Sequence, residues 1–119
     1  ATSNGHITKY SNYSSELVHL AAPGGEGMTP LFSLSTQNPA NAVLAPMEGT
    51  SMASPVAAGV AALVLGMDKT LAPADIREIM METGDELATL KNVTVSGRQV
   101  NAKNAVQKVL DLKPVLAGN

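Results

Sequence analysis

The longest apolar stretch of the chain lies near its middle, from Met52 to Gly66. Among these fifteen residues, MASPVAAGVAALVLG, Ser54 has the only polar side chain. A helix without a polar face has no side to turn toward water, so the pattern predicts a helix that is buried on all sides. Pro55 suits its first turn, where a missing N–H costs no internal hydrogen bond. Because crossing a bilayer takes about 20 apolar residues, this stretch is too short and we expect no membrane contact.

Two amphipathic helices are predicted after this stretch. The first begins at Pro73 and ends at Gly84, with Asp75 in its first turn, where a carboxylate faces the positive end of the helix dipole. The second covers residues 102 to 111, with Asn101 as its predicted N-cap. Both segments place side chains along one helical face, namely Ile76, Ile79, Met80 and Thr83 in the first and Ala102, Ala105, Val106, Val109 and Leu110 in the second.

Four short β-compatible runs precede the apolar stretch, at residues 6–10, 17–21, 31–36 and 42–46. We expect 6–10 to pair with 17–21, and 31–36 to pair with 42–46 across a loop of turn-forming residues at 37–41. The isolated chain is therefore expected to be an α+β protein, with short strands before residue 51 and a buried helix after it.

Length and composition indicate a single domain and exclude some kinds of partner and chemistry. With 119 residues, 45% of them apolar, the chain is long enough to form one domain around a core. Its 8 basic and 10 acidic residues are scattered and give a net charge of −2, so we expect no nucleic-acid partner. The absence of Cys excludes a disulfide framework and a thiolate nucleophile. The first ten residues lack the pattern of a signal peptide or an anchor, and we expect them to follow a cut inside a longer protein.

Ser51 stands where an extended segment gives way to the predicted apolar helix, and its hydroxyl has two interpretations. In one, Ser51 is an N-cap whose oxygen accepts a backbone N–H. In the other, it is a nucleophile at a helix start, where unpaired N–H groups and the positive dipole end stabilise an oxyanion. Gly49 suits the second interpretation, because a residue without Cβ lets a substrate backbone come close.

The string GTSMASP at residues 49–55, followed by a helix of small apolar residues, resembles the serine motif of the subtilisin-like serine peptidases. The similarity extends to both sides of this motif. ITKYSNY and VHLAAPG resemble the family's strand, SNY turn and APG segment ahead of the serine, and LST resembles the piece between them. LAPADIR resembles the start of the following helix, and GR with VNA resembles the approach to the final helix. Residues 6 to about 110 are covered.

The resemblance implies a serine endopeptidase that cleaves peptide or protein substrates through a Ser-His-Asp triad. Ser51 would be the nucleophile, Gly49 and Thr50 would support the nucleophile loop and the oxyanion site, and Met52 would be a site neighbour. Met52 is either an oxidisable neighbour of the nucleophile or a plain core methionine. The implied fold is an α/β three-layer arrangement of a parallel sheet with helices. Residues 1–119 would form the C-terminal, incomplete part of this catalytic domain.

Family order places the catalytic aspartate and histidine, and the asparagine that completes the oxyanion hole, N-terminal to everything in this chain. We therefore expect the chain alone to be inactive, and we expect either a companion chain that carries these motifs or self-association through exposed apolar surface. The resemblance favours an extracellular or otherwise extracytoplasmic enzyme. No metal or other cofactor is predicted for this chain, and a family calcium site cannot be located in it.

Four other features of the sequence bear on this interpretation. His6 and His19 both lie outside a family-like context and are not expected to be catalytic, and the aspartates are better explained by helix capping or solvation. Glu48 replaces the uncharged residue that is common at this position in the family. An esterase-type nucleophile would need Gly-x-Ser-x-Gly, and Ala53 stands where the second glycine would be. A non-catalytic assembly module with a peptidase-like sequence remains the alternative function.

Overall fold

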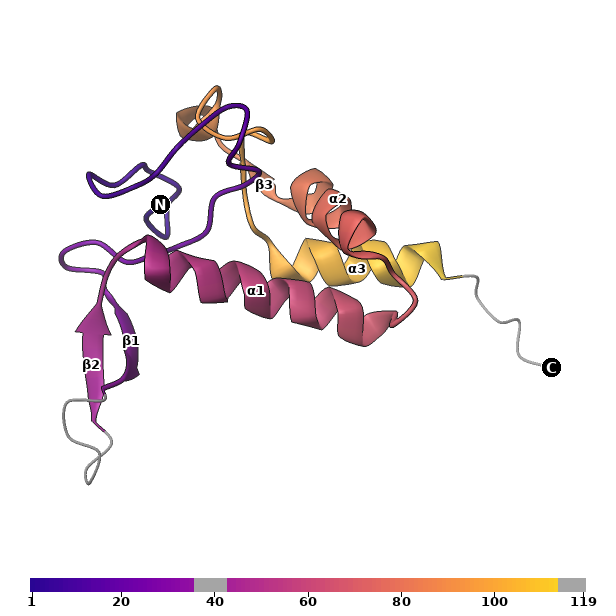
Figure 1. Cartoon of the computed structure of the whole chain (residues 1–119), viewed down its shortest axis with the longest axis horizontal. Helices are drawn as coiled ribbons and strands as arrows, with labels where there is room; N and C mark the ends of the chain where they lie inside the picture. Colours follow the sequence, from indigo (N-terminus) through magenta and orange to yellow (C-terminus); the bar gives the residue numbers. More distant parts are fainter. Residues whose placement is uncertain (36–42, 114–119) are drawn as a thin grey trace.

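A computed structural model describes residues 1–35 and 43–113 of the chain (Figure 1). The molecule is flat, with principal extents of 55 × 41 × 21 Å. Three helices, α1 (Thr50–Met67), α2 (Pro73–Thr83) and α3 (Ala102–Leu112), lie together at one side. Loops and a β-hairpin surround the N-terminal end of α1 at the other side.

The ends of α2 and α3 confirm the predictions from the sequence. Pro73 is the first residue of α2, the carboxylate of Asp75 accepts the N–H of Ala72 over 2.9 Å, and Gly84 is the C-cap. The side-chain oxygen of Asn101 accepts the N–H of Asn104 over 3.0 Å and so caps α3. These caps depend on contacts within a few residues, which is why the sequence alone predicts them.

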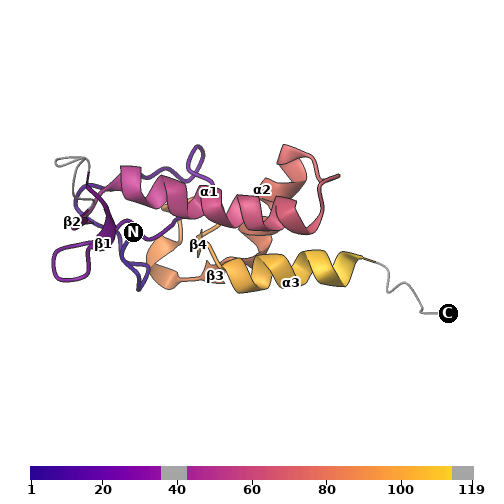
Figure 2. The same ribbon diagram turned by 90° about the horizontal axis from the view of Figure 1, so that it is seen from below.

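The hydrophobic core lies where the three helices meet, and α1 packs against both of the others (Figure 2). Each helix contributes two buried apolar side chains to one cluster, which consists of Val60, Val64, Ile79, Met80, Ala105 and Val109. Val64 and Ala105 are completely buried. The predicted inward faces of the second and third helices are thus the faces that pack, except at Leu110, which is 45% exposed.

The prediction that the apolar helix is buried on all sides is wrong for this chain. Within α1 only Val60 and Val64 are buried, whereas Leu63 and Leu65 are 54% and 41% exposed. The described residues cover one face of α1 and leave the others open. The helix also has 18 residues rather than fifteen, so by length and composition alone it is long enough to cross a membrane, a property shared by core helices of water-soluble proteins.

The predicted pairing of the third and fourth β-runs is confirmed. β1 (Leu31–Leu34) and β2 (Leu44–Met47) form an antiparallel pair in which Leu31 lies opposite Met47. The predicted loop at 37–41 lies outside the described residues. β2 ends two residues before Gly49, so the hairpin leads directly into α1.

The predicted strands at 6–10 and 17–21 are not formed. Residues 18–21 form backbone hydrogen bonds with residues 95–100 rather than with 6–10. Ala21 donates its N–H to the carbonyl of Arg98 over 2.9 Å and accepts the N–H of Val100 over the same distance, which makes a single parallel bridge. Short β-compatible runs form strands only where a partner edge is available, and here the partner edge was more than 70 residues away in the sequence.

A small second sheet supplies that edge. β3 (Asp85–Glu86) pairs in antiparallel fashion with β4 (Arg98–Gln99), and a 3₁₀ helix, η1 (Ala88–Leu90), lies between them in sequence. Leu90 of η1 is completely buried. The chain is therefore an α+β arrangement, and solved structures with the same arrangement are described below with the site.

Candidate active site

Ser51 is the second residue of α1, and Gly49 is the N-cap. Gly49 adopts φ 144° and ψ 168°, a backbone conformation in which side-chain-bearing residues are rarely found. No side chain caps this helix start. The interpretation of Ser51 as the N-cap is therefore wrong, and its exposed side chain is not engaged in a hydrogen bond with any described residue.

The first turn of α1 leaves backbone donors unused beside this hydroxyl. The carbonyl oxygen of Gly49 accepts the N–H of Met52 over 3.0 Å and that of Ala53 over 3.2 Å. Within the described residues, the N–H groups of Thr50 and Ser51 have no acceptor. Both groups lie at the positive end of an 18-residue helix dipole. An exposed hydroxyl next to free N–H donors is an arrangement that suits attack on a carbonyl and stabilisation of the resulting oxyanion.

Ser51 borders an open hollow of about 470 Å³. The hollow lies between the hairpin and the first two turns of α1, and its walls are mostly apolar. Its lining residues are Leu31, Phe32, Ser33, Met47, Ser51, Met52, Pro55 and Val56. We call this hollow the Ser51 groove. The hairpin thus supplies one wall of a groove that has the candidate nucleophile on its other wall.

Gly24 contacts the start of α1 through a backbone hydrogen bond. The N–H of Gly49 donates to the carbonyl oxygen of Gly24 over 2.9 Å. A Cβ on Gly24 would lie 2.5 Å from the carbonyl oxygen of Gly49 and 3.3 Å from the Cβ of Ala53, so only glycine fits. The hydroxyl of Tyr10 donates to the carbonyl oxygen of Gly25 and holds the same segment. From the sequence, VHLAAPG at 18–24 is identified by its resemblance to a family segment, and no local pattern predicts the contact of Gly24 with the helix start.

Met52 lies close to the N-cap, as its predicted place beside the site requires. Its sulfur is 3.6 Å from the position that a Cβ on Gly49 would occupy. The side chain is half-buried and lines the Ser51 groove. Met52 is therefore at once a wall of the groove and a packed methionine.

Neither histidine lines the Ser51 groove. His6 is exposed, and His19 borders a different hollow together with Ser54 and Ala57 of α1. Since these two are the chain's complete set of histidines, no imidazole lies among the groove residues to take the proton of Ser51.

The aspartates are engaged elsewhere. Asp75 caps α2, Asp85 accepts a hydrogen bond from Asn101, and Asp111 accepts one from Gln107. The hydroxyl and then the N–H of Thr70 donate to Asp68 and hold the pKa of that carboxyl below its ordinary value. Among residues 1–35 and 43–113, no group of three His, Cys, Asp or Glu side chains could hold a metal ion.

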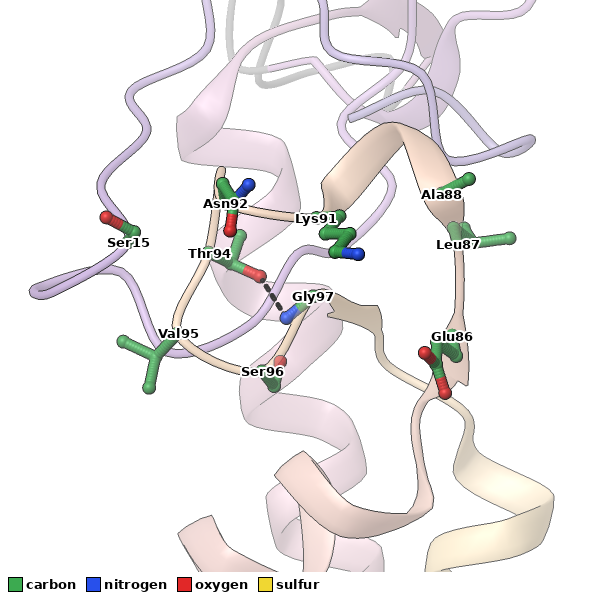
Figure 3. Close-up of a pocket in the computed structure, with 10 residues that line it drawn as sticks. All are labelled: Ser15, Glu86, Leu87, Ala88, Lys91, Asn92, Thr94, Val95, Ser96 and Gly97. Atoms are coloured by element: carbon green, nitrogen blue, oxygen red, sulfur yellow. Dashed lines mark hydrogen bonds between the residues drawn. The ribbon is translucent and has the colours of Figure 1, made fainter.

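A larger hollow of about 680 Å³ lies away from Ser51, between η1 and the loop before β4 (Figure 3). Glu86 and Lys91 are the charged residues that line it, and the hydroxyl of Thr94 accepts the N–H of Gly97 across its floor over 3.0 Å. None of the residues that line this hollow belongs to the serine motif at 49–55. The candidate chemistry therefore lies in the smaller groove.

Comparison with known proteins gives one consistent answer. Residues 1–108 match the family described as Peptidase S8, the subtilase family. Halolysin of Haloferax mediterranei is 40% identical over 100 residues, which cover 84% of this chain and 17% of halolysin. The extracellular basic protease of Dichelobacter nodosus is 33% identical over 113 residues, which cover 92% of this chain and 18% of that protease. The chain thus spans less than a fifth of the length of these two relatives.

Solved structures with the same arrangement of elements include proteases from Pseudoalteromonas arctica. One of them superposes with a TM-score of 0.77 at 31% identity and covers 89% of this chain and 33% of that one. A subtilase cytotoxin, SubAB, superposes with a TM-score of 0.72 at 23% identity, covering 85% of this chain and 29% of that one, which shows likeness of fold alone. The predicted assignment to the α/β fold of these peptidases is confirmed at the level of a fragment.

Proposed function

We propose that this chain, which belongs to the subtilase family, supplies the nucleophile Ser51 to the active site of a serine endopeptidase. The observation that carries the proposal is the exposed hydroxyl of Ser51 beside the free N–H groups of the first turn of α1. Protease relatives that are 33 to 40% identical over most of the chain support the same reaction class.

In the proposed reaction, the Oγ atom of Ser51 attacks the carbonyl carbon of a peptide bond while a histidine takes its proton. The carbonyl oxygen becomes an oxyanion that accepts the N–H of Ser51. The C–N bond then breaks, the histidine gives its proton to the leaving amine, and water hydrolyses the acyl group from Oγ. Gly49 leaves the oxyanion side open because it has no Cβ, and Thr50 continues the same turn.

The histidine, its orienting aspartate and a second oxyanion donor must come from another stretch of polypeptide, because none of the chain's histidines lines the groove. The exposed faces of α1 and of the hairpin support such a companion. Leu63 of α1 is 54% exposed, and Phe32 and Leu44 of the hairpin are 66 and 64% exposed. Exposed apolar surface of this kind is common at sites of association with other polypeptide. We propose that the chain alone does not hydrolyse peptides.

Two further features of the proposal concern substrate and location. The mostly apolar Ser51 groove would accommodate apolar parts of a peptide or protein substrate. An extracellular location is proposed because relatives are named as extracellular proteases. The same exposed apolar faces also favour the second candidate function, a non-catalytic assembly module that associates with itself or with another chain.

Peptide cleavage by a catalytically complete polypeptide that contains this segment distinguishes the endopeptidase from the assembly module. Ser51→Ala should lower kcat by more than about a thousandfold while leaving the far-ultraviolet circular dichroism unchanged, since only one hydroxyl is removed. Ser54→Ala is the matched control, because Ser54 lies one turn further along α1 and borders a different hollow. Substantial peptide cleavage by the Ser51 variant would refute the nucleophile assignment and favour the assembly module.

A further inference from the structure

We propose that Glu48 is a positioning residue for Ser51. Its carboxylate accepts a hydrogen bond from a neighbouring turn and so links that turn to the connection between β2 and α1. This inference rests on the proposed function of Ser51.

The turn in question covers residues 26–29. Glu26 and Thr29 exchange backbone hydrogen bonds of 3.2 and 2.8 Å, which places Gly27 and Met28 at the tip. Gly27 has φ 49°, a left-handed value that suits glycine, and Met28 is 99% exposed. The N–H of Gly27 donates to Oε2 of Glu48 over 2.7 Å. This bond joins positions that are 21 residues apart in the sequence.

Glu48 and Gly49 together form the entire connection between β2 and α1. Both residues are held by the segment 24–27, since Gly49 donates to the carbonyl of Gly24 and Glu48 accepts from Gly27. The same segment lies close to Met47, the residue before Glu48. A Cβ on Gly25 would lie 2.8 Å from the carbonyl oxygen of Met47. Met47, Glu48 and Gly49, the three residues before α1, therefore all contact the segment 24–27.

This arrangement has a direct consequence for the nucleophile. Gly49 has no Cβ to restrict its backbone, so the direction in which α1 begins depends on contacts made by its neighbours. The bond of Glu48 is the side-chain contact in this connection, and a carboxylate acceptor makes a shorter and stronger bond than a neutral one. Because Ser51 follows three residues later, loss of this contact should loosen the position of Oγ, on which attack geometry depends.

Glu48→Ala removes the acceptor, whereas Glu48→Gln keeps a side-chain oxygen without the charge. Glu78→Ala is the matched control, since it removes an exposed glutamate from α2, remote from the groove. In the 119-residue chain, hydrogen exchange of the Gly27 amide should be about tenfold faster in Glu48→Ala and unchanged in Glu78→Ala. In a catalytically complete polypeptide, the rate of Ser51 phosphonylation should fall about tenfold in Glu48→Ala, with KM for peptides changed less than kcat.

Glu48→Gln should bring both the exchange rate and the phosphonylation rate to values between those of Glu48→Ala and the unmodified protein, because its amide oxygen can accept the same N–H but more weakly than a carboxylate. Faster Gly27 exchange with an unchanged phosphonylation rate would overturn the positioning role and leave the nucleophile assignment intact. Unchanged exchange would overturn the contact itself. Absence of Ser51 labelling in the unmodified enzyme would instead refute the proposed function, a result that the exchange measurement does not depend on.

Discussion

The carbonyl oxygen of Gly24 accepts the N–H of Gly49 over 2.9 Å, which joins the segment at residues 22–25 to the start of the helix that carries Ser51. The two glycines approach so closely that a Cβ on Gly24 would lie 2.5 Å from the carbonyl oxygen of Gly49. Such a distance is far inside van der Waals contact, so there is no room for a side chain between this segment and the helix start.

Gly24→Ala should therefore destabilise the chain by about 1–3 kcal/mol, the usual cost of forcing a methyl group into a filled space. Gly59→Ala is the control, because a Cβ there meets nothing within 4 Å in the middle of α1. The control should raise stability by up to about 1 kcal/mol, since alanine favours the helix. Urea unfolding followed by circular dichroism measures both. Equal midpoints for Gly24→Ala and the unmodified chain would contradict the tight contact.

Leu90→Ala should cost about 2–5 kcal/mol, because the side chain of Leu90 is completely buried and its loss leaves a cavity. Leu17→Ala removes the same atoms from a side chain that is 80% exposed and should change stability by less than about 0.5 kcal/mol. The same unfolding experiment compares the two variants. Similar midpoints for both would show that η1 is not part of the stable structure.

Asn101→Ala should destabilise α3 by about 1 kcal/mol, because the N–H of Asn104 loses its acceptor. Asn101→Ser keeps a capping oxygen but loses the bond from the Asn101 amide to Asp85, and it should cost only a few tenths of a kcal/mol. Thermal unfolding of the two variants separates the cap from the second contact. A serine variant as unstable as the alanine variant would assign the stability to the Asp85 bond instead.

The pKa of Asp68 should lie below its ordinary value, chiefly because the Thr70 hydroxyl donates to its carboxylate. A lowered carboxyl pKa contributes stability above the ordinary pKa of the group, and this contribution fades as the pH falls through the lowered value. Thr70→Val should raise the pKa of Asp68 only part of the way, since the N–H of residue 70 still donates. NMR titration of Asp68 tests this. Added salt should preserve most of the lowering, and its complete loss in salt would point to charge rather than hydrogen bonding.

Sequence reasoning succeeded where structure depends on near neighbours. Pro73, Gly84 and Asn101 mark helix ends through caps that involve residues at most three positions away. The hairpin of β1 and β2 was also predicted, since its strands are close in sequence. Membership in the subtilase family followed from GTSMASP and the segments around it.

The failures share a different cause, because each depends on which parts of the chain come together, and no local pattern records this. The strands expected at 6–10 and 17–21 had no mutual edge, and residue 21 instead pairs with residue 99. The exposure of α1 reflects what lies against it rather than its own composition. Glu48 was noted only as a departure from the family, because nothing local shows that its carboxylate reaches Gly27, 21 residues earlier.

The most direct test of the central claim is mass-spectrometric mapping of a serine-directed phosphonate on this chain, with and without the polypeptide that completes the active site. We predict one phosphonyl group per chain on the peptide that contains Ser51 when the completing polypeptide is present. The isolated chain should show no labelling above background, because no histidine lines the groove to take the proton. Labelling at another serine, or stoichiometric labelling of Ser51 in the isolated chain, would contradict the account.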